Sequence, residues 1–129
     1  VGSTMGLKQF VLSELPPILC IAIKRFTSFS KIDMMVPFQE EIDLLPFLKK
    51  GAADNMDHSQ CVYRLYGCVV HSGGMRGGHY IAYTRPYTYL DNGMNGRWYY
   101  SSDSYVTTAE LKQVLGCQAY LLFYERVKT

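Results

Sequence analysis

Hydrophobic residues along the chain are grouped into short runs that have the length of β-strands. The clearest run covers residues 61–71 (CVYRLYGCVVH), which is rich in β-branched and aromatic side chains. A period of two places positions 61, 63 and 65 on one face of a strand and positions 62, 64 and 66 on the other. A second run at 80–85 follows a glycine-rich segment, so we expect a hairpin over residues 61–85 with a long glycine tip.

Other apolar runs predict the rest of a sheet. Residues 18–26 (ILCIAIKRF) are apolar on both faces over most of their length, which predicts a central strand covered on both sides. Residues 97–101 predict a third strand and residues 119–127 a closing strand. In the apolar run 42–48, Pro46 forbids a regular strand or helix.

One short helix is predicted from about Ala109 to Leu115, with Thr107 or Thr108 as its N-cap and Gly116 at its end. Segments without periodicity at 27–33, 49–60 and 86–96 are expected to be loops. The fold class is therefore α+β, a mostly antiparallel sheet with one or two short helices. We expect residues 1–6 to be a loop or a cloning remnant, and residues 7–127 to form one domain.

Composition and charge narrow the function classes. The chain has 129 residues, of which 48% are hydrophobic and 19% charged, so a single packed core is expected. Lys and Arg number 13 against 11 Asp and Glu, with no basic run longer than two residues, which argues against direct nucleic-acid binding. No apolar stretch approaches the ~20 residues of a membrane-spanning helix, so no membrane partner is expected.

The four cysteines, Cys20, Cys61, Cys68 and Cys117, show no CxxC spacing, which favours a reducing intracellular setting in the cytoplasm, the nucleus or both. None makes a convincing nucleophile. Cys20 and Cys68 lie inside predicted strands, and Cys61 has no basic neighbour. Cys117 follows a predicted helix C-terminus, where the helix dipole raises the pKa of a thiol.

A zinc site is one possible use of the histidines and cysteines, because His58 and Cys61 mirror the spacing of Cys68 and His71. If residues 61–71 form one strand, the two cysteines lie roughly 23 Å apart. Only a sharp turn at Gly67 would bring the four side chains together. We therefore expect no metal and no other cofactor.

His79 stands out among the three histidines because it follows Gly77 and Gly78, where the glycine loop returns into a strand. A rigid strand then holds the imidazole while the loop gives access to it. A catalytic imidazole needs a partner that accepts a hydrogen bond from Nδ1–H. The segment 101–103 (SSD) can supply one such residue, although a serine-rich segment is also typical of an ordinary turn.

The order of four motifs resembles that of the ubiquitin-specific proteases, the ubiquitin carboxyl-terminal hydrolases. These motifs are residues 17–26 (PILCIAIKRF), residues 63–73 (YRLYGCVVHSG) with 78–83 (GHYIAY), residues 98–103 (WYYSSD), and residues 119–126 (AYLLFYER). The resemblance covers residues 7–127. Within the family, the start at Lys8 and the ending 118–126 are most similar to ubiquitin-specific proteases 16 and 45.

The resemblance implies a papain-like cysteine protease fold, of which this chain is the C-terminal part with most of the palm sheet. The family's cysteine box and zinc-binding region have no counterpart in the sequence. The implied activity is that of a thiol isopeptidase, which hydrolyses the bond after the C-terminal glycine of ubiquitin. His79 is then the general base for a cysteine outside this chain, so the chain alone is expected to be inactive. The implied partners are ubiquitin and ubiquitinated proteins, with histones suggested by the subgroup.

The resemblance also assigns roles to residues around His79. Gly73, Gly74, Gly77 and Gly78, with Tyr80 beside them, are implied to clamp the narrow Gly-Gly tail of ubiquitin.

Ser102 stands where most members of the family carry Asp or Asn, and Asp103 follows it. A regular strand sends these two side chains to opposite faces. We expect Ser102 to be the direct partner of His79, and Asp103 to compensate through a water or a distorted backbone.

Two other readings of the sequence stay open. The first is a non-catalytic ubiquitin-binding or scaffolding module in which His79 is a relic. The second is a different cysteine–histidine hydrolase, such as one with a transglutaminase-like fold. The glycine loop and the tyrosine that follows His79 argue against that fold.

Overall fold

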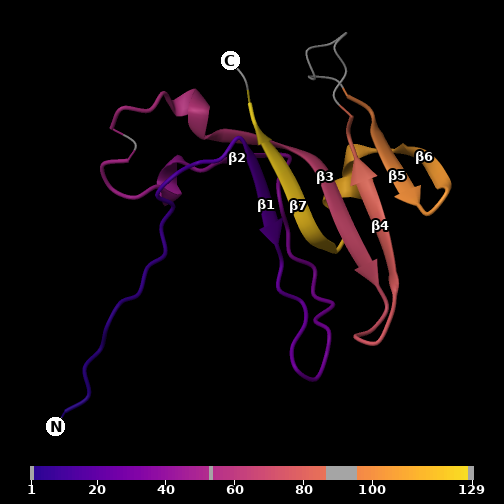
Figure 1. Ribbon diagram of the computed structural model, residues 1–129, viewed down its shortest axis with the longest axis horizontal. Helices are drawn as coiled ribbons and strands as arrows, with labels where there is room; N and C mark the ends of the chain where they lie inside the picture. Colours follow the sequence, from indigo (N-terminus) through magenta and orange to yellow (C-terminus); the bar gives the residue numbers. More distant parts are fainter. Residues whose placement is uncertain (1, 53, 87–95, 128–129) are drawn as a thin grey trace.

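The fold is an antiparallel sheet of seven strands in the order β1-β7-β3-β4-β5-β6, with β2 paired to β3 off this path (Figure 1). This computed structural model describes residues 2–52, 54–86 and 96–127. The strands are β1 (Ile18–Ala22), β2 (Glu41–Asp43), β3 (Val62–Ser72), β4 (His79–Thr84), β5 (Trp98–Ser102), β6 (Tyr105–Ala109) and β7 (Ala119–Arg126). The helices are α1 (Leu111–Leu115) and the 3-10 helices η1 (Leu45–Phe47) and η2 (His58–Cys61). The predicted α+β class is confirmed.

The hairpin predicted over residues 61–85 is formed by β3 and β4, which pair from Gly67 with Thr84 to Ser72 with His79. Tyr63 and Leu65 are buried on one face of β3, and the alternating residues 62, 64 and 66 are half-buried, as the pattern predicts. A register shift against β7 follows Leu65, so that Cys68 is buried as well. Residues 87–95 of the expected loop at 86–96 lie outside the described residues.

The expectation of a central strand over residues 18–26 is wrong. β1 ends at Ala22 and lies at one edge of the sheet, with Ile18, Cys20 and Ala22 exposed. β7, expected as a closing strand, takes the central place between β1 and β3. An apolar run on both faces indicates surface that can be buried, but it does not determine which strand has two backbone partners.

The segment before the helix forms a strand that the sequence did not reveal. Thr107 and Thr108, expected as helix caps, pair with Tyr100 and Tyr99 in the β5–β6 ladder. The helix α1 starts at Leu111 instead. Glu110 is its N-cap and exchanges capping hydrogen bonds with the third residue of the helix, which closes the first turn.

Pro46 breaks the apolar run 42–48 as predicted. β2 ends at Asp43, and the proline lies in the first turn of the short helix η1. This position tolerates proline, which has no backbone N–H, because the first N–H groups of a helix have no partner within the helix.

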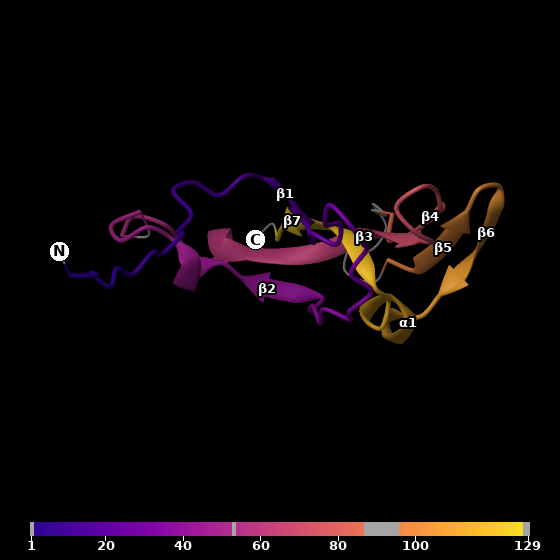
Figure 2. The same ribbon diagram turned by 90° about the horizontal axis from the view of Figure 1, so that it is seen from below.

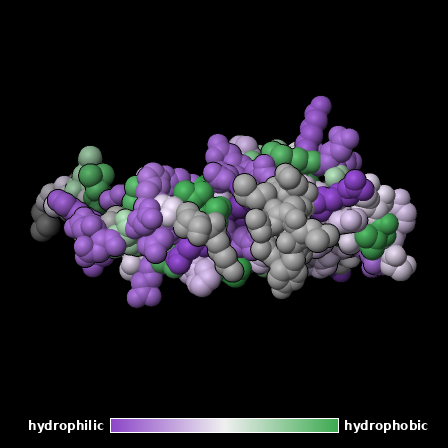
Figure 3. Space-filling model, turned by 90° about the horizontal axis from the view of Figure 1, so that it is seen from above, coloured by the Kyte–Doolittle hydropathy of each residue, from purple (hydrophilic) through white to green (hydrophobic). Residues whose placement is uncertain are grey.

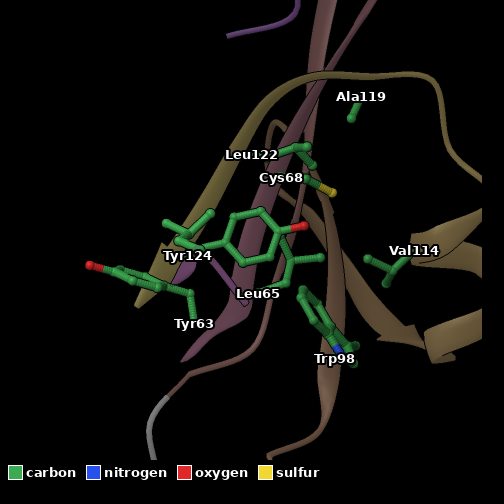
Figure 4. Close-up of a cluster of buried hydrophobic side chains, with 9 residues drawn as sticks. Tyr63, Leu65, Cys68, Trp98, Val114, Ala119, Leu122 and Tyr124 are labelled. Atoms are coloured by element: carbon green, nitrogen blue, oxygen red, sulfur yellow. The ribbon is translucent and has the colours of Figure 1, made fainter. Parts of the chain in front are cut away.

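The core lies on the side of the sheet that α1 covers (Figure 2). Figure 4 shows the side chains of Leu65, Trp98 and Tyr124 gathered in its centre, with Val114 of α1 beside them. Its buried members are Leu44, Tyr63, Leu65, Cys68, Trp98, Val114, Ala119, Leu122 and Tyr124. Each large apolar side chain buried here contributes roughly 1.5–3 kcal/mol to stability. This core fixes the strands that carry the candidate site.

The N-terminal segment runs away from the sheet as an extended chain (Figures 1 and 2). Residues 2–6 contain no helix or strand, and the side chains of Met5, Leu7 and Phe10 are almost fully exposed. Figure 3 shows one face of the molecule, on which hydrophobic patches are separated by hydrophilic surface. Within the described part of the chain, no helix combines the length and the apolar character needed to cross a membrane.

Candidate active site

His79 is the first residue of β4, directly after the glycine tip of the hairpin. Its backbone pairs with Ser72 at the end of β3, so a ladder fixes the position of the residue. The imidazole side chain is 46% exposed. The histidine is therefore anchored on a rigid element and still open to an incoming group.

Ser102 lies next to the ring of His79. The β4–β5 register pairs Ala82 with Ser101, and one further step places Ser102 beside Ile81. His79 and Ile81 point to the same face of β4, so Ser102 and His79 become diagonal neighbours. The Oγ atom of Ser102 lies 2.6 Å from Nε2 of His79. The expected contact through Nδ1 is thus wrong, because the partner lies on the other ring nitrogen.

Asp103 approaches the opposite side of the ring. β5 and β6 end on the pair Ser102 with Tyr105, so Asp103 and Ser104 form a two-residue turn. Asp103 has a φ of 51°, a left-handed conformation that aspartate tolerates in such turns. Its Oδ2 lies 4.0 Å from Nδ1 of His79, which is too long for a hydrogen bond. Because the strand ends here, alternation no longer separates the two side chains, and both lie near His79.

The four glycines of the tip differ in what they require. Gly73 has a φ of 108°, and a Cβ atom there would lie 2.9 Å from the Cα of Gly78. A Cβ atom on Gly78 would collide with the carbonyl oxygen of Ser72 and the ring of His71. At Gly74 and Gly77 a Cβ atom would meet nothing within 4 Å. The backbone on the two sides of the tip therefore comes into close contact at residues 73 and 78, while residues 74 and 77 border open space.

His71 is a residue of the site for which the sequence predicted no role in catalysis. Its ring is buried between Phe26, at a centroid distance of 5.5 Å, and Tyr80, at 4.8 Å. Its Nδ1 has no hydrogen-bond partner among the described residues. Nζ of Lys31 donates a hydrogen bond of 2.7 Å to its carbonyl oxygen. Its place in the sequence could have indicated that it lies near the site, because His71 comes eight residues before His79 on the other side of the glycine loop.

A cavity of about 690 Å³ lies beside the glycine tip. Gly73 and Gly74 line it together with His71 and Gln118, whereas Gly77, Gly78 and Tyr80 are not among its lining residues. Lys31 also lines the cavity. Of the residues expected to bind the ubiquitin tail, two therefore line this cavity and the other three lie outside it.

The expected environments of two thiols need correction. Cys20 is exposed at the sheet edge and not enclosed in a strand interior. The pKa of the Cys117 thiol is lowered, not raised, because the hydrogen bond with Cys68 favours its charged form and Arg25 is nearby. The dipole of the five-residue helix α1 is outweighed by these closer groups. Cys61 and Cys68 are buried, and burial raises the pKa of Cys61.

β3 continues through Gly67 without the sharp turn that a zinc site would need. In the ranges that the structure describes, no three side chains of His, Cys, Asp or Glu are placed to hold a metal ion.

The fold and the histidine site define a class of protein. The sequence profile of the family "Ubiquitin carboxyl-terminal hydrolase" matches residues 3–124, nearly the whole chain. The chain belongs to this family of cysteine-type deubiquitinating hydrolases, the ubiquitin-specific proteases.

Individual relatives agree with the predicted subgroup. Mouse ubiquitin carboxyl-terminal hydrolase 16 is 36% identical over 146 residues, and zebrafish ubiquitin carboxyl-terminal hydrolase 45 is 36% identical over 143 residues. Each match covers 96% of this chain and 18% of the relative. The chain thus spans about a fifth of the length of these relatives.

A solved structure confirms the predicted fold. The SAGA Ubp8/Sgf11/Sus1/Sgf73 DUB module bound to ubiquitin aldehyde matches with a TM-score of 0.75 at 27% identity. The match covers 92% of this chain and 26% of the matched chain. The chain has the mostly antiparallel sheet of the C-terminal part of this papain-like catalytic domain.

Proposed function

We propose that this chain is the base-bearing, C-terminal part of a deubiquitinating thiol isopeptidase. The proposal is carried by one observation, the 2.6 Å contact between Nε2 of His79 and Oγ of Ser102 at an accessible position beside a glycine tip. Membership of the family supplies the reaction class. Ser102 and Asp103 are proposed as the residues that orient His79 and stabilise its charged form.

We propose a role for each nitrogen of the ring, in the tautomer that carries its hydrogen on Nε2. Nε2–H donates to the hydroxyl oxygen of Ser102, which leaves the lone pair of the neutral ring on Nδ1. Nδ1 is then the basic atom. Once Nδ1 gains a proton, the carboxylate of Asp103 at 4.0 Å stabilises the imidazolium electrostatically. A neutral hydroxyl alone does this less well than a carboxylate.

The reaction needs a cysteine from outside this chain. Nδ1 of His79 takes the thiol proton, and the thiolate attacks the carbonyl carbon of the C-terminal glycine of ubiquitin. The C–N bond then breaks as His79 returns the proton to the leaving lysine amine. Water releases ubiquitin from the thioester, with His79 again as the base. Without the cysteine the chain is inactive on its own.

The glycine tip is proposed to hold the tail of ubiquitin. Gly73, Gly74, Gly77 and Gly78 present backbone without side chains, which lets a narrow Gly-Gly segment approach closely. Tyr80 is 57% exposed beside them and can cover the tail. The similar SAGA module, solved with ubiquitin aldehyde, supports ubiquitin as the ligand.

The wider setting of the proposed enzyme follows from its relatives. Its partners are ubiquitin and ubiquitinated proteins, and the similarity to hydrolases 16 and 45 extends this proposal to ubiquitinated histones. An intracellular location, in the cytoplasm or the nucleus, fits these partners.

Hydrolysis of a fluorescent C-terminal amide of ubiquitin tests the function. In a complete enzyme that contains this chain, His79→Ala should lower kcat by about 10²–10⁴-fold, the usual range of general acid–base catalysis. His58→Ala is the matched control, because His58 is bound to Asp43 at 2.8 Å outside the site and should leave turnover unchanged. Equal losses in both variants would refute the assigned role of His79.

Turnover by the longest form of the protein separates this proposal from a non-catalytic ubiquitin-binding module. The proposal expects no turnover from the chain alone and restored turnover when the remainder of a catalytic domain is present. Ubiquitin binding without turnover in the longest form of the protein would favour the binding module.

A further inference from the structure

Two thiols that the proposed catalysis does not use face each other across the core. Cys68 lies in β3, and Cys117 lies in the turn between α1 and β7. Their sulfur atoms are 3.7 Å apart. In Figure 4 the sulfur of Cys68 points away from β3 toward the side on which Val114 of α1 lies. Two thiols that are 49 positions apart in the sequence are therefore in contact in the fold.

The surroundings make the two thiols unequal. Cys68 is 1% exposed, while Cys117 is only partly buried. The hydrogen bond from Cys68 lowers the pKa of the Cys117 thiol, and the buried guanidinium of Arg25 acts in the same direction. The same hydrogen bond, and then burial, raise the pKa of Cys68. A thiol that is more acidic and more accessible reacts first with oxidants.

Arg25 is held firmly enough to act as a fixed charge. Its Nε donates to the carbonyl oxygen of Ala119 at 2.8 Å, two residues after Cys117. Its Nη1 donates to the carbonyl oxygens of Ile32 and Met34 at 3.1 and 2.6 Å. The cation is therefore tied to the start of β7, next to the turn that carries Cys117.

We propose that Cys68 and Cys117 form a reversible disulfide when the folded chain meets a hydroperoxide. Disulfide sulfur atoms lie about 2.04 Å apart, so the two atoms must approach by roughly 1.7 Å. Because Cys117 lies in a turn, side-chain rotation with a small backbone shift supplies this movement. The bond joins β3 to the α1–β7 turn and constrains the unfolded chain over a long loop.

The chemistry balances with the peroxide as the only oxidant. The thiolate of Cys117 attacks one peroxide oxygen, the O–O bond breaks, and a sulfenic acid and hydroxide form. The sulfur of Cys68 then attacks the sulfenic sulfur, the S–S bond forms, and the S–O bond breaks. The thiol proton of Cys68 leaves with that oxygen as water. With hydrogen peroxide as the hydroperoxide, the released hydroxide takes up the proton that the Cys117 thiol had lost. Two thiols are then oxidised, and one hydrogen peroxide is reduced to two waters.

Peptide mapping after oxidation tests the pair. Trypsin cuts after Lys and Arg, which places Cys68 in peptide 65–76 and Cys117 in peptide 113–126. Cys20 and Cys61 fall in two other peptides. The reduced, folded chain is treated with hydrogen peroxide, free thiols are blocked with N-ethylmaleimide, and the digest is analysed by mass spectrometry. We expect one predominant cross-link, 65–76 with 113–126, which a thiol reductant reverses.

Variants and denaturant supply the controls. Cys117→Ser should abolish the cross-link, whereas Cys20→Ser combined with Cys61→Ser should leave it unchanged. In urea the fold is lost, so pairs with the other cysteines should appear. The same mixture of pairs with and without urea would overturn the proposal. So would irreversible oxidation of Cys117 with Cys68 left as a free thiol. Neither outcome depends on ubiquitin or on the proposed catalysis.

Discussion

At the scale of single residues, the candidate site rests on one unusual pairing. A serine hydroxyl contacts Nε2 of His79, and the only nearby carboxylate, Asp103, stands 4.0 Å from Nδ1 among the residues described around the ring. The hydroxyl fixes the direction of the ring, while the carboxylate supplies charge. In the proposed mechanism, two residues therefore share the work that one carboxylate does in a simple triad.

Removing the hydroxyl tests its part in this arrangement. We expect Ser102→Ala in the complete enzyme to lower kcat about tenfold, equivalent to ~1.4 kcal/mol, because one hydrogen bond that orients the ring is lost. KM should change little, since Ser102 touches the histidine and not the ubiquitin tail. Steady-state kinetics with the fluorescent amide measures both constants.

Ser104→Ala is the matched control for this change, because Ser104 lies in the same turn and is exposed. It should match the parent in kcat. If Ser102→Ala also matches the parent, the contact has no catalytic value, and the proposed role of Ser102 is wrong.

The close crossing of the glycine tip gives a second prediction. Gly78→Ala should destabilise the chain by about 1–3 kcal/mol, because the new Cβ atom collides with the Ser72 carbonyl and the His71 ring. Urea unfolding followed by tryptophan fluorescence measures the loss. Gly74→Ala, which adds the same atom into open space, should leave the unfolding free energy within ~0.5 kcal/mol of the parent. Equal losses in both variants would contradict the described tip.

At the scale of elements, local sequence patterns predicted which neighbouring strands form a hairpin. They did not predict where each strand lies in the sheet. The β3–β4 hairpin followed from alternation and a glycine tip, since both signals are local. β1 was misplaced because its apolar pattern does not specify its neighbours, which are set by contacts distant in sequence. β6 was missed because its threonines also suit a helix cap, and only pairing with β5 decides between the two.

The candidate site likewise has features that the sequence predicts and features that depend on how the strands pair. His79 and the segment 101–103 were predictable from residue type and order. The ring nitrogen that meets Ser102 depends on the β4–β5 register, and the approach of Asp103 depends on its φ of 51°. Neither quantity can be read from the pattern of hydrophobic and polar positions.

Asp43 gives a prediction for the elements around η1. Its Oδ1 accepts the N–H of Leu45 at 3.0 Å and its Oδ2 lies 2.8 Å from Nε2 of His58, so it links β2 to η1 and η2. The pKa of Asp43 is lowered, first by the Leu45 hydrogen bond and then by His58. A lowered folded-state pKa stabilises the fold above the unfolded value of about 3.9, and this stability is lost as pH falls through the folded value.

We therefore expect Asp43→Asn to lower the urea midpoint at pH 6 to 7 and to converge with the parent as the pH falls below the unfolded value of an aspartate, about 3.9. Asp54→Asn controls for the loss of one negative charge. A midpoint difference that grows as the pH falls would contradict the assigned sign.

At the scale of the whole molecule, this chain covers 18% of its relatives' length and leaves apolar surface open. Met5, Leu7 and Phe10 are exposed, and a second cavity of about 550 Å³ lies over β1, β7, β3 and β4, with Ile18 and Phe123 among its lining residues. Exposed apolar surface favours association with other protein surface. The proposed catalysis likewise needs a nucleophile from outside the chain.

Labelling with an electrophilic ubiquitin tests the central claim most directly. A ubiquitin that carries a reactive group at its C-terminus forms a covalent bond only with a cysteine whose thiol is activated in the complete enzyme. We predict labelling of the enzyme that contains this chain, loss of labelling with His79→Ala, and normal labelling with His58→Ala. Labelling of the His79→Ala variant at the rate of the parent would contradict the claim that His79 is the base.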